Sequence, residues 1–583
     1  MCEAVRILLL HPEDNLLSGP WAQETWDRVV DLVQAGENAY ERWGRAFGCV
    51  VESLGAVDLG EYGRIRRLLE AGQGRLMDDW GLDWWELISV NFDQQIGSIL
   101  LLQKFVDGLH EGDQVFATRG GFHVNVLEQM LGKGIRCFSS GRPSLVQRSR
   151  HYRKLTKKFS VSQLGEIFWD KYDSDYRIRG RLSFTRTTHA QPVVLLPSAY
   201  VNVSRMGVRY AEMVPDAEFL LVATRPSGWM ERLPSNVKTA RLAAYARGTQ
   251  AVQREFVELL QEWEQLRGEM GAVPELAILD RLGAFARFSK LLRAGLGIRN
   301  AWLRVLETEP VESVLCCDDT NPYTRIPLLL AKQRGLPTVT CHHGGLDAGH
   351  LIKRNHADVV LAKGRMEHDY LTRVCGVRAE QVEIGGPAQP AVPTAQRAGH
   401  ARTPWIVFFS EPYEIVGGRT EEFYQDLLPP LANLAEETGR ELVIKLHPME
   451  SASERRRLVE RIEPVRHRMI RVVTGPLDEE LLRKTWFAIT VLSTAAMDCA
   501  LRGVPCFLCH WLEYFSCGYS EQFCRFGAGV KLGSAGDIAS IPEMLKTSKG
   551  RAGVPSDLSS PIASARLREL LSGRMAVRQA AAV

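Results

Sequence analysis

The sequence predicts an α/β fold built from two Rossmann-like domains that face a cleft, with a helical elaboration in the N-terminal half. Predicted strands alternate with predicted helices over much of the chain, which is the pattern of parallel sheets. At 583 residues the chain is too long for one hydrophobic core. Residues 387–404 contain four prolines and several small residues, and this composition predicts a linker between the two domains.

The first domain is expected over residues 1–386 and begins with regular alternation. Strands are predicted at 6–10, 29–33, 49–54 and 114–118, and helices at 39–47 and 122–131. Residues 62–109 have helical character and are rich in tryptophan. The order of these elements favours a parallel sheet covered by helices.

From about residue 140 to 310 the alternation is less regular. Strand-like segments occur at 192–203 and 219–223, and residues 240–270 are helical and rich in Glu, Gln and Arg. We interpret this region as an elaboration within or beside the first domain. The basic run at 148–158 has two interpretations, a solvated loop or a contact with anionic lipid or a phosphorylated acceptor.

Regular alternation returns after residue 312. The predicted strands are 313–317, 338–341, 359–362 and 381–384, and the predicted helices are 326–332 and 366–374. Asp318 and Asp319 follow the first of these strands, and His342, His343 and Gly344 follow the second. Polar groups are therefore expected at the carboxyl ends of two neighbouring strands.

The second domain is expected over residues 405–572, followed by a tail at 573–583. Its predicted strands are 405–410, 442–446, 487–492 and 505–509, and its predicted helices are 495–501 and 562–571. This order again favours a parallel sheet.

Composition restricts the classes of partner and the cellular location. Lys and Arg number 72 against 69 Asp and Glu, a net charge of +3, which gives no reason to expect nucleic acid as the partner. The sequence pI near 8.2 is compatible with anionic substrates or membrane surfaces. No window of about 18 apolar residues predicts a membrane span, and residues 1–11 lack a basic leader. The expected location is the cytoplasm, including the inner face of a membrane.

Cysteine spacing predicts buried reduced thiols. The twelve cysteines are scattered, and Cys506 and Cys509 form a C-x-x-C within the apolar run 504–511. A metal or redox pair is the alternative, but no second ligand cluster follows at zinc spacing. We therefore expect no metal at this cysteine pair.

Two strand ends in the second domain carry the strongest functional signal. His447 and Pro448 follow the apolar strand 442–446, and proline cannot continue a β-ladder. Ser493 and Thr494 follow strand 487–492 and open a run of helix formers. Hydroxyls and backbone N–H groups at a helix start favour anions, and ligands of open α/β sheets bind at the carboxyl ends of strands. The sequence therefore predicts a diphosphate pocket here.

These motifs resemble those of a group of bacterial enzymes. Lys445-Leu-His447-Pro448 and the Ser493-Thr494 segment through residue 505 are similar to the His-Pro and Ser/Thr motifs of GT-B enzymes that use nucleotide-activated donors. That group includes CDP-glycerol glycerophosphotransferases, sialyl- and polysialyltransferases, and capsule Kdo transferases. Residues 337–344 likewise resemble the strand and His-Gly turn before the linker of that group. The resemblance covers about residues 310–530.

The resemblance implies a GT-B glycosyltransferase that moves a sugar or a polyol-phosphate from a nucleotide-activated donor to a surface-polysaccharide or lipid-linked acceptor. It implies a CMP-, CDP- or UDP-linked donor substrate and neither a bound cofactor nor a metal. The expected partners are the nucleotide-sugar donor and a glycan or lipid-linked acceptor, and contact with a membrane surface is compatible with both.

The resemblance also assigns expected roles to side chains. His447 would donate to a phosphate oxygen or the ribose, and Ser493 and Thr494 would supply hydroxyls to the phosphate. The alternative for His447 is a capped strand-end histidine without a ligand. Lys445 either extends a cationic wall or lies at the sheet rim, and Glu411 either binds the ribose or base or is a surface turn carboxylate.

An inverting transferase also requires a general base on the acceptor side. The candidates are Asp319, His343 and Asp14, ranked in that order, because each follows a predicted strand. Gly344 is expected either to permit close approach to the ligand or to form a plain tight turn. A retaining mechanism would need no such base, and both stereochemical courses remain open.

Two other functions are compatible with this fold. A UDP-sugar 2-epimerase would show further carboxylates and a His-x-Glu-Ala-Gly-like turn, from which the segment His342 to Asp347 departs. The other alternative is a non-catalytic protein that binds nucleotide sugars in a polysaccharide assembly complex. The Lys-x-His-Pro motif and the Ser-Thr pair favour the transferase over this non-catalytic protein.

Overall fold

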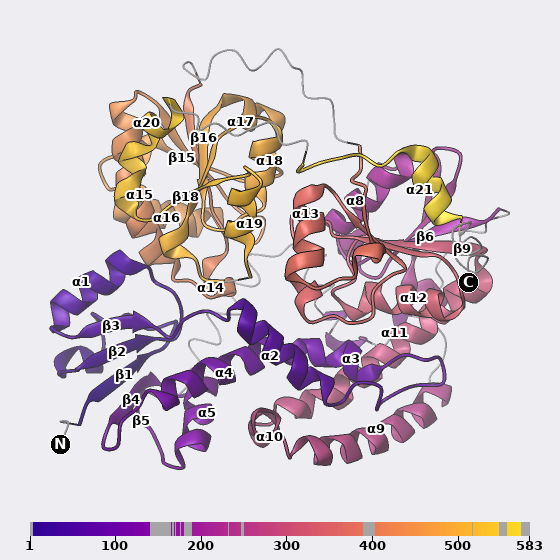
Figure 1. Ribbon diagram of the computed structural model, residues 1–583, viewed down its shortest axis with the longest axis horizontal. Coiled ribbons are helices and arrows are strands. Elements are labelled where there is room, and N and C mark those ends of the chain that lie inside the picture. The colour runs from indigo at the N-terminus through magenta and orange to yellow at the C-terminus, as the bar shows by residue number, and fades with distance from the viewer. Residues whose placement is uncertain are drawn as a thin grey trace. The chain divides into compact units, whose positions relative to one another are not determined.

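A computed structural model describes residues 4–139, 165, 168, 169, 171–174, 176–179, 189, 191–230, 232–246, 250–388, 403–515, 517–546 and 557–572. The described strands form three sheets, and every strand pair in them is parallel. Helices connect the strands, as parallel pairing requires (Figure 1). The predicted α/β class with Rossmann-like domains is confirmed.

The N-terminal sheet has the strand order β3-β2-β1-β4-β5. Its strands are β1 (Arg6–Leu10), β2 (Arg28–Asp31), β3 (Val50–Ser53), β4 (Gln114–Arg119) and β5 (Arg136–Ser139). The apolar run of β1 is buried on both faces, which explains its central position. Helix α1 (Glu37–Phe47) places Trp43 in the core beside Leu8 and Val29.

The central sheet has the strand order β12-β11-β10-β9-β6-β7-β8. Its strands are β6 (Val193–Ser198), β7 (Glu218–Ala223), β8 (Val237–Arg241), β9 (Val311–Cys316), β10 (Thr338–Cys341), β11 (Val359–Ala362) and β12 (Val382–Ile384). All six residues of β6 are buried, so this strand lies within the sheet rather than at its rim.

The C-terminal sheet has the strand order β15-β14-β13-β16-β17-β18. Its strands are β13 (Trp405–Phe409), β14 (Glu441–Lys445), β15 (Ile470–Val473), β16 (Thr485–Thr490), β17 (Cys506–Cys509) and β18 (Val530–Leu532). Helices α15 (Thr420–Glu437), α16 (Ala452–Ile462) and α18 (Ala495–Leu501) are among those that connect them. The core of this sheet includes Phe408, Phe423 and Phe487.

The three sheets share one topology. Counted along the chain within each sheet, the first and fourth strands are neighbours, and later strands add outward on both sides. The switch points are therefore β1 with β4, β6 with β9, and β13 with β16. In doubly wound sheets a ligand binds outside the carboxyl ends of the strands at this switch point.

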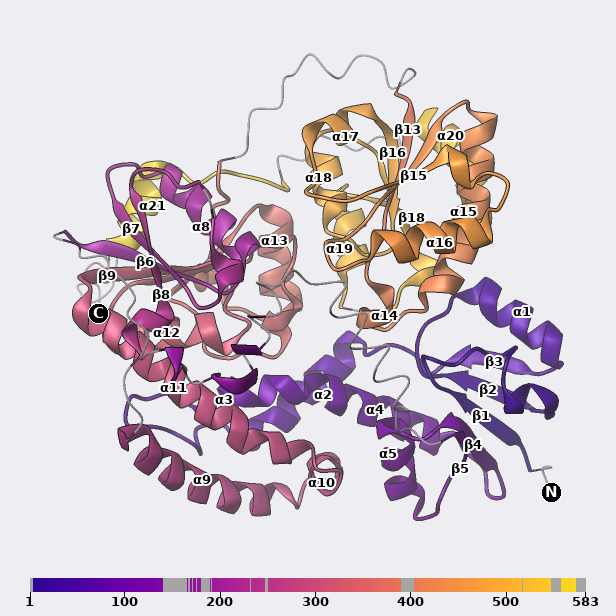
Figure 2. The same ribbon diagram turned by 180° about the vertical axis from the view of Figure 1, so that it is seen from behind.

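The expected first domain differs from the structure. The region at 140–310 was expected to be an elaboration, yet it supplies β6, β7 and β8 of a second Rossmann-like sheet. It also supplies α9 (Gln250–Met270) and α11 (Phe288–Thr308), which lie side by side in both views (Figures 1 and 2). Trp263 of α9 stacks on Phe288 of α11 with ring centroids 3.8 Å apart.

Contacts divide the chain into two compact units that differ from the expected domains. One unit comprises Met1–Glu61, Gly97–Ser149 and Ala391–Leu558, and the other Tyr62–Ile96, Arg150–Pro390 and Ser559–Val583. The N-terminal and C-terminal sheets thus belong to one unit and the central sheet to the other.

The end of the expected second domain also belongs elsewhere. Gly386 donates from its N–H to Ser560 O and accepts from Ile562 N, so this segment pairs beside the central sheet. Helix α21 (Ser564–Leu571) then packs Leu567 into the core of that sheet. Local sequence patterns do not show that a chain returns to an earlier sheet.

Three expected segments lie outside the described residues. The linker at 387–404 lies mostly outside them, and the tail at 573–583 and the basic run at 148–158 lie entirely outside them.

Two predictions from composition can be compared with the structure. Cys506 and Cys509 are both buried in β17, so their expected burial is confirmed. None of the helices in the described part of the chain combines the length and apolar character that a membrane span needs.

Candidate functional site

Five residues from the donor-site prediction meet at the carboxyl edge of the C-terminal sheet. Glu411 follows β13, His447 and Pro448 follow β14, and Ser493 and Thr494 follow β16. Because β13 lies between β14 and β16, the ends of the outer two strands are about 10 Å apart. The predicted placement of all five residues at one sheet edge is thus realised in the fold.

Glu411 is the most enclosed of these residues. Its side chain accepts hydrogen bonds from Thr490 Oγ1 at 3.1 Å, from Leu492 N at 3.1 Å and from the Tyr514 hydroxyl. Burial raises its pKa to about 7, although these three donors act in the opposite direction. The interpretation of Glu411 as a surface turn carboxylate is therefore wrong. Its contacts fix the loop after β16 and the ring of Tyr514.

His447 is exposed, and its contacts define which ring nitrogen faces solvent. Its Nδ1 accepts from Met449 N at 3.2 Å, so the neutral ring carries its proton on Nε2. The backbone N–H of His447 donates to Glu450 Oε2 at 2.7 Å, and Glu450 is held by Ser410 and Arg455. Neighbouring protein atoms still remove part of the water around the ring, and this desolvation, followed by the charge of Lys445, lowers the pKa of His447. At neutral pH the Nε2–H group is thus a fixed, uncharged donor.

Lys445 is buried, and two carbonyl groups hold its ammonium. Nζ donates to Leu446 O at 3.0 Å and to Gly475 O at 2.6 Å. The side chain lines a cavity of about 250 Å³ together with Asp478 and Thr474. Burial lowers its pKa. These contacts direct Lys445 toward the segment after β15, and its ammonium acts on His447 through its charge rather than through a hydrogen bond.

The hydroxyl pair begins a short helix at the predicted place. Ser493 Oγ accepts from Ala495 N at 3.3 Å, and Ser493 N donates to Thr490 Oγ1 at 3.4 Å. Thr494 is the N-cap of α18, and its side chain makes no capping hydrogen bond. Both residues are half-buried. The Thr494 hydroxyl is therefore available to a ligand.

The predicted residues of the central sheet form a separate cluster in the other compact unit. At the switch point of β6 and β9, the Tyr200 hydroxyl donates to Asp318 Oδ2 at 2.9 Å and lies 3.2 Å from His343 Nε2. Asp318 also accepts from Thr320 N and Asn321 Nδ2. Burial lowers the pKa of His343 although the Asp318 carboxylate opposes this, so the imidazole is neutral at pH 7.

Asp319 is not a free carboxylate. Lys353 Nζ donates to Asp319 Oδ1 at 2.6 Å and to Asp347 Oδ2 at 2.9 Å, and all three side chains are buried. Burial alone would raise the pKa of Asp319, but the Lys353 charge outweighs it and the pKa falls to about 2. Asp319, Asp347 and His350 are close enough to hold a metal ion, yet the Lys353 ammonium already provides their positive charge.

Gly344 supports the same loop through its backbone. Its N–H donates to His342 Nδ1 at 3.2 Å, and its carbonyl accepts from the Lys363 ammonium. These contacts agree with a tight turn after β10. Asp319, His343 and Gly344 all lie at the edge of the central sheet, in a different compact unit from the five residues after β13, β14 and β16.

Asp14 lies after β1 in the N-terminal sheet, where it pairs with Arg119 Nη2 at 2.6 Å. The loop that carries it contacts the C-terminal part of the same unit. Arg419, the N-cap residue of α15, donates to the carbonyl oxygens of His11, Pro12 and Asp14 and forms a two-pronged pair with Asp31. One buried guanidinium therefore joins the N-terminal and C-terminal sheets.

Sequence reasoning did not find Tyr200, Tyr514, Lys353 or Arg419. Tyr200, Tyr514 and Arg419 each bond a residue that is distant in the sequence, whereas the partners of Lys353 are nearer. None of the four belongs to a motif or directly follows a predicted strand. Only contacts in three dimensions identify them.

Comparisons with known proteins show a distant similarity of fold. No protein-family model matches the chain, and no curated protein matches it. Among solved structures, a MnaA–UDP co-structure from S. aureus aligns at 12% identity and a TM-score of 0.40, covering 66% of this chain and 98% of that one. MurG from Acinetobacter baumannii aligns at 12% identity and 0.38, covering 65% and 99%. The calicheamicin glycosyltransferase CalG4 aligns at 13% identity and 0.36, covering 67% and 95%. Similarities at this level do not determine an activity.

Proposed function

We propose that the protein is a glycosyltransferase that uses a nucleotide-activated donor and a surface-polysaccharide or lipid-linked acceptor. The group transferred is a sugar or a polyol-phosphate. In this proposal the donor phosphates bind at the carboxyl edge of the C-terminal sheet. The proposal extends to a metal-independent reaction, in which protein groups alone stabilise the leaving phosphate.

The observation that supports the proposal most is the convergence of polar strand ends at one topological switch point. Glu411 and the Ser493-Thr494 pair follow the two strands that define the switch, and His447 follows the next strand outward. This is the place where doubly wound sheets bind nucleotides. A nucleoside diphosphate is long enough to reach from His447 to the hydroxyl pair.

The chemistry of these groups suits a departing phosphate. Negative charge develops on the phosphate as the donor bond breaks, and fixed donors stabilise that charge without reorganising. His447 Nε2–H and the Thr494 hydroxyl are donors that have no acceptor among the described residues. In the proposal Glu411 orients the site through Thr490 and Tyr514, because protein donors already occupy its oxygens.

The general base remains a prediction among Asp319, His343 and Asp14. Lys353 holds Asp319 as a low-pKa carboxylate, and Arg119 holds one oxygen of Asp14. His343 retains a neutral imidazole beside Tyr200 and Asp318. A neutral imidazole accepts a proton readily near pH 7, so the contacts favour His343 for this role.

Donor turnover by the full-length protein tests the proposal. The protein is incubated with CMP-, CDP- and UDP-linked donors, and released nucleotide and altered sugar are quantified by chromatography. Slow donor hydrolysis that His447→Ala abolishes supports the transferase. His467→Ala is the matched control, because this ring bonds Pro464 O away from the switch point. Sugar interconversion would identify an epimerase, and binding without turnover would identify a non-catalytic protein; either result overturns the proposal.

A further inference from the structure

The N-terminal sheet has its own cluster of polar groups at its switch point. His11 and Asp14 follow β1, and Arg119 ends β4. His123 lies in the first turn of the next helix and is within electrostatic reach of His11. The proposed donor site uses none of these groups, and only Asp14 has been given a role, as one of three candidates for the general base.

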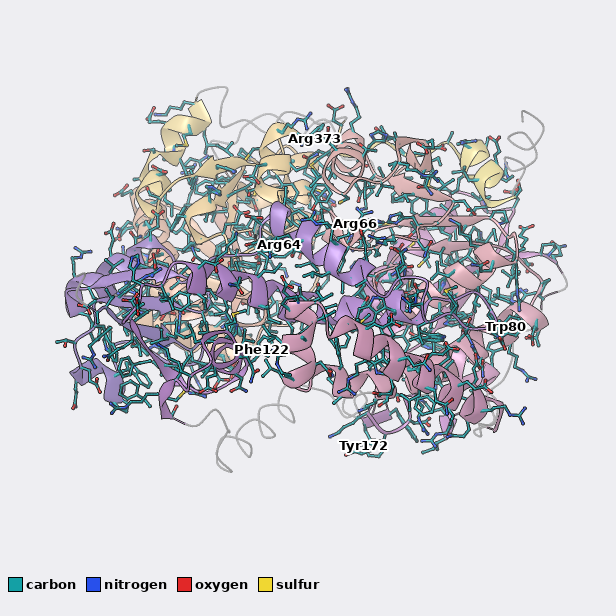
Figure 3. The ribbon with its side chains drawn as sticks, turned by 60° about the horizontal axis from the view of Figure 1, so that its bottom comes forward. Arg64, Arg66, Trp80, Phe122, Tyr172 and Arg373 are labelled. Carbon is teal, nitrogen blue, oxygen red and sulfur yellow. The ribbon has the colours of Figure 1, made fainter. Side chains whose placement is uncertain are left out.

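The helix after β4 presents unused backbone donors. Helix α5 (Phe122–Leu131) starts directly after Gly120 and Gly121, and its N-cap Gly121 offers no side chain. Figure 3 labels Phe122, the first residue of this helix. The N–H groups of Phe122, His123 and Val124 have no acceptor among the described residues. A Cβ atom added to Gly121 would meet no described residue within 4 Å, so none of the described side chains fills the space at the helix start. Such a start attracts anions.

Buried atoms without partners point to a ligand independently of the helix. The Asp14 side chain is only 7% exposed, and its Oδ2 has no partner in the described part of the chain. Arg119 Nε is also buried and without an acceptor there. A buried polar atom without a partner is costly, so Oδ2 calls for a hydroxyl donor and Nε for an acceptor. Arg119 donates from Nη2 to Asp14 Oδ1 and from Nη1 to Glu13 Oε2, both at 2.6 Å, and it stands two residues before Gly121, the N-cap of α5.

The loop that carries Asp14 is held in place before any ligand arrives. Arg419 donates to His11 O at 2.9 Å, to Pro12 O at 3.1 Å and to Asp14 O at 2.8 Å. Such fixation reduces the entropy that binding would cost. Arg419 belongs to the segment that follows Glu411, so this loop contacts the part of the chain that carries the proposed donor site.

The two imidazoles complete the set of donors. His11 Nδ1 accepts from Glu13 N at 3.2 Å, so its neutral ring carries a proton on Nε2. Burial lowers the pKa of His123 to about 4 and also lowers that of His11. Both rings are therefore neutral at pH 7 and add hydrogen-bonding capacity without fixed charge.

We infer that this edge binds a phosphorylated polyol or sugar, with its phosphate at the start of α5 near Arg119 and a hydroxyl group on Asp14 Oδ2. The two kinds of unused group require a ligand that combines an anion with a hydroxyl. That this ligand is the acceptor rests on the proposed transferase function. That the ligand binds here does not depend on that function.

Calorimetric titration of the full-length protein with glycerol 3-phosphate tests the inference. Binding is expected, with inorganic phosphate and glycerol each binding at least tenfold more weakly. Asp14→Asn and His123→Gln should each weaken binding at least tenfold. Asp107→Asn and His110→Gln are the matched controls, because both residues are exposed and lie before β4, at the other end of the sheet. Each variant's melting temperature confirms that it is folded.

Two further measurements identify the source of the phosphate and separate the two proposals. Co-sedimentation with phosphatidylglycerol vesicles, compared with phosphatidylcholine vesicles, shows whether the same group is recognised on a lipid. The inference is supported if the protein binds glycerol 3-phosphate or phosphatidylglycerol vesicles and Asp14→Asn weakens that binding. The inference is wrong if the protein binds neither glycerol 3-phosphate nor phosphatidylglycerol vesicles. It is also wrong if Asp14→Asn and His123→Gln bind as tightly as the wild type. His447→Ala should leave glycerol 3-phosphate binding unchanged, so loss of the donor site alone would not imitate that failure.

Discussion

Glu411 shows how burial sets the chemistry of a single side chain. Its pKa of about 7 in the folded protein lies above its ordinary value of 4.5. Between these values the folded chain holds a proton that the unfolded chain has lost. The carboxyl group therefore contributes stability that is full below pH 4.5 and disappears as the pH rises through 7.

Glu411→Gln should remove this part of the pH dependence. The wild type should lose about 3 kcal/mol of unfolding free energy between pH 4.5 and 8 in excess of the variant, since one pKa unit corresponds to about 1.4 kcal/mol. Urea denaturation at several pH values measures the difference. Parallel curves for both proteins would show that Glu411 titrates normally.

The Lys353→Met variant tests whether the Lys353 ammonium keeps Asp319 ionised. Lys353→Met leaves two buried carboxylates without their cation, so the unfolding free energy at pH 7 should fall by about 3–5 kcal/mol. In the wild type, the low pKa of Asp319 gives stability that is present above its ordinary pKa of 3.8 and lost as the pH falls through 2. The variant should show the reverse trend and recover stability as the pH falls toward 4.

Lys290→Met is the control for this change, because Lys290 is exposed and its loss should alter stability by less than about 0.5 kcal/mol. A similar small effect of Lys353→Met would mean that Asp319 and Asp347 do not depend on the ammonium.

At the residue scale the sequence could predict positions but not partners. A polar residue after an apolar strand is visible in the sequence, and this located Glu411, His447, Asp319 and His343. The pKa of each depends on its burial, and the pKa of Asp319 also depends on the charge of Lys353, both of which arise only in the folded chain. The expected surface position of Glu411 was wrong for this reason.

At the scale of elements, one threonine links the ends of β13 and β16. The Thr490 hydroxyl shares its one hydrogen between Phe409 O and Glu411 Oε1, and its oxygen accepts from Ser493 N. Thr490→Val should cost about 1–3 kcal/mol of unfolding free energy, because buried groups lose their partner. It should also weaken nucleotide binding, since the loop that carries Ser493 loses its anchor.

Thr485→Val at the opposite end of β16 provides the comparison. Thr485 is equally buried, and its hydroxyl donates to Leu481 O, so this change should lower stability but preserve nucleotide binding. Thermal unfolding with and without nucleotide separates the two effects. Equal loss of binding in both variants would point to general destabilisation of the strand.

Elements with strong local patterns could be predicted well, and their assembly into sheets could not. The helix predicted at 495–501 is α18, and the strands predicted at 6–10 and 338–341 are β1 and β10. Strands β6 to β8 were assigned to an elaboration because the irregular sequence around them interrupts the alternation. Hydrophobic periodicity records local burial and contains nothing about which distant strand will be a neighbour.

At the scale of the whole molecule, the N-terminal and C-terminal sheets share one compact unit although 260 or more residues separate them in the chain. The buried Arg419–Asp31 pair is one of the connections. Arg419→Met should lower the unfolding free energy by about 3–5 kcal/mol, because a buried carboxylate and three carbonyl groups lose their donor.

Hydrogen exchange followed by mass spectrometry can locate this effect. Protection should fall together in β1 and in the residues after β13, while the central sheet in the other unit keeps its protection. Arg42→Met, which removes one hydrogen bond to Gln425, is the control and should cost about 1 kcal/mol. A loss confined to the N-terminal sheet would contradict coupling through Arg419.

The central proposal is that the carboxyl edge of the C-terminal sheet binds the donor phosphates. Thermal shift of the full-length protein with CMP, CDP, UDP and GDP tests it most directly, because a ligand that prefers the folded state raises the melting temperature. We expect a pyrimidine nucleotide to raise it in the wild type and both His447→Ala and Thr494→Val to reduce the shift. No shift with any nucleotide, or an undiminished shift in both variants, would contradict the proposal.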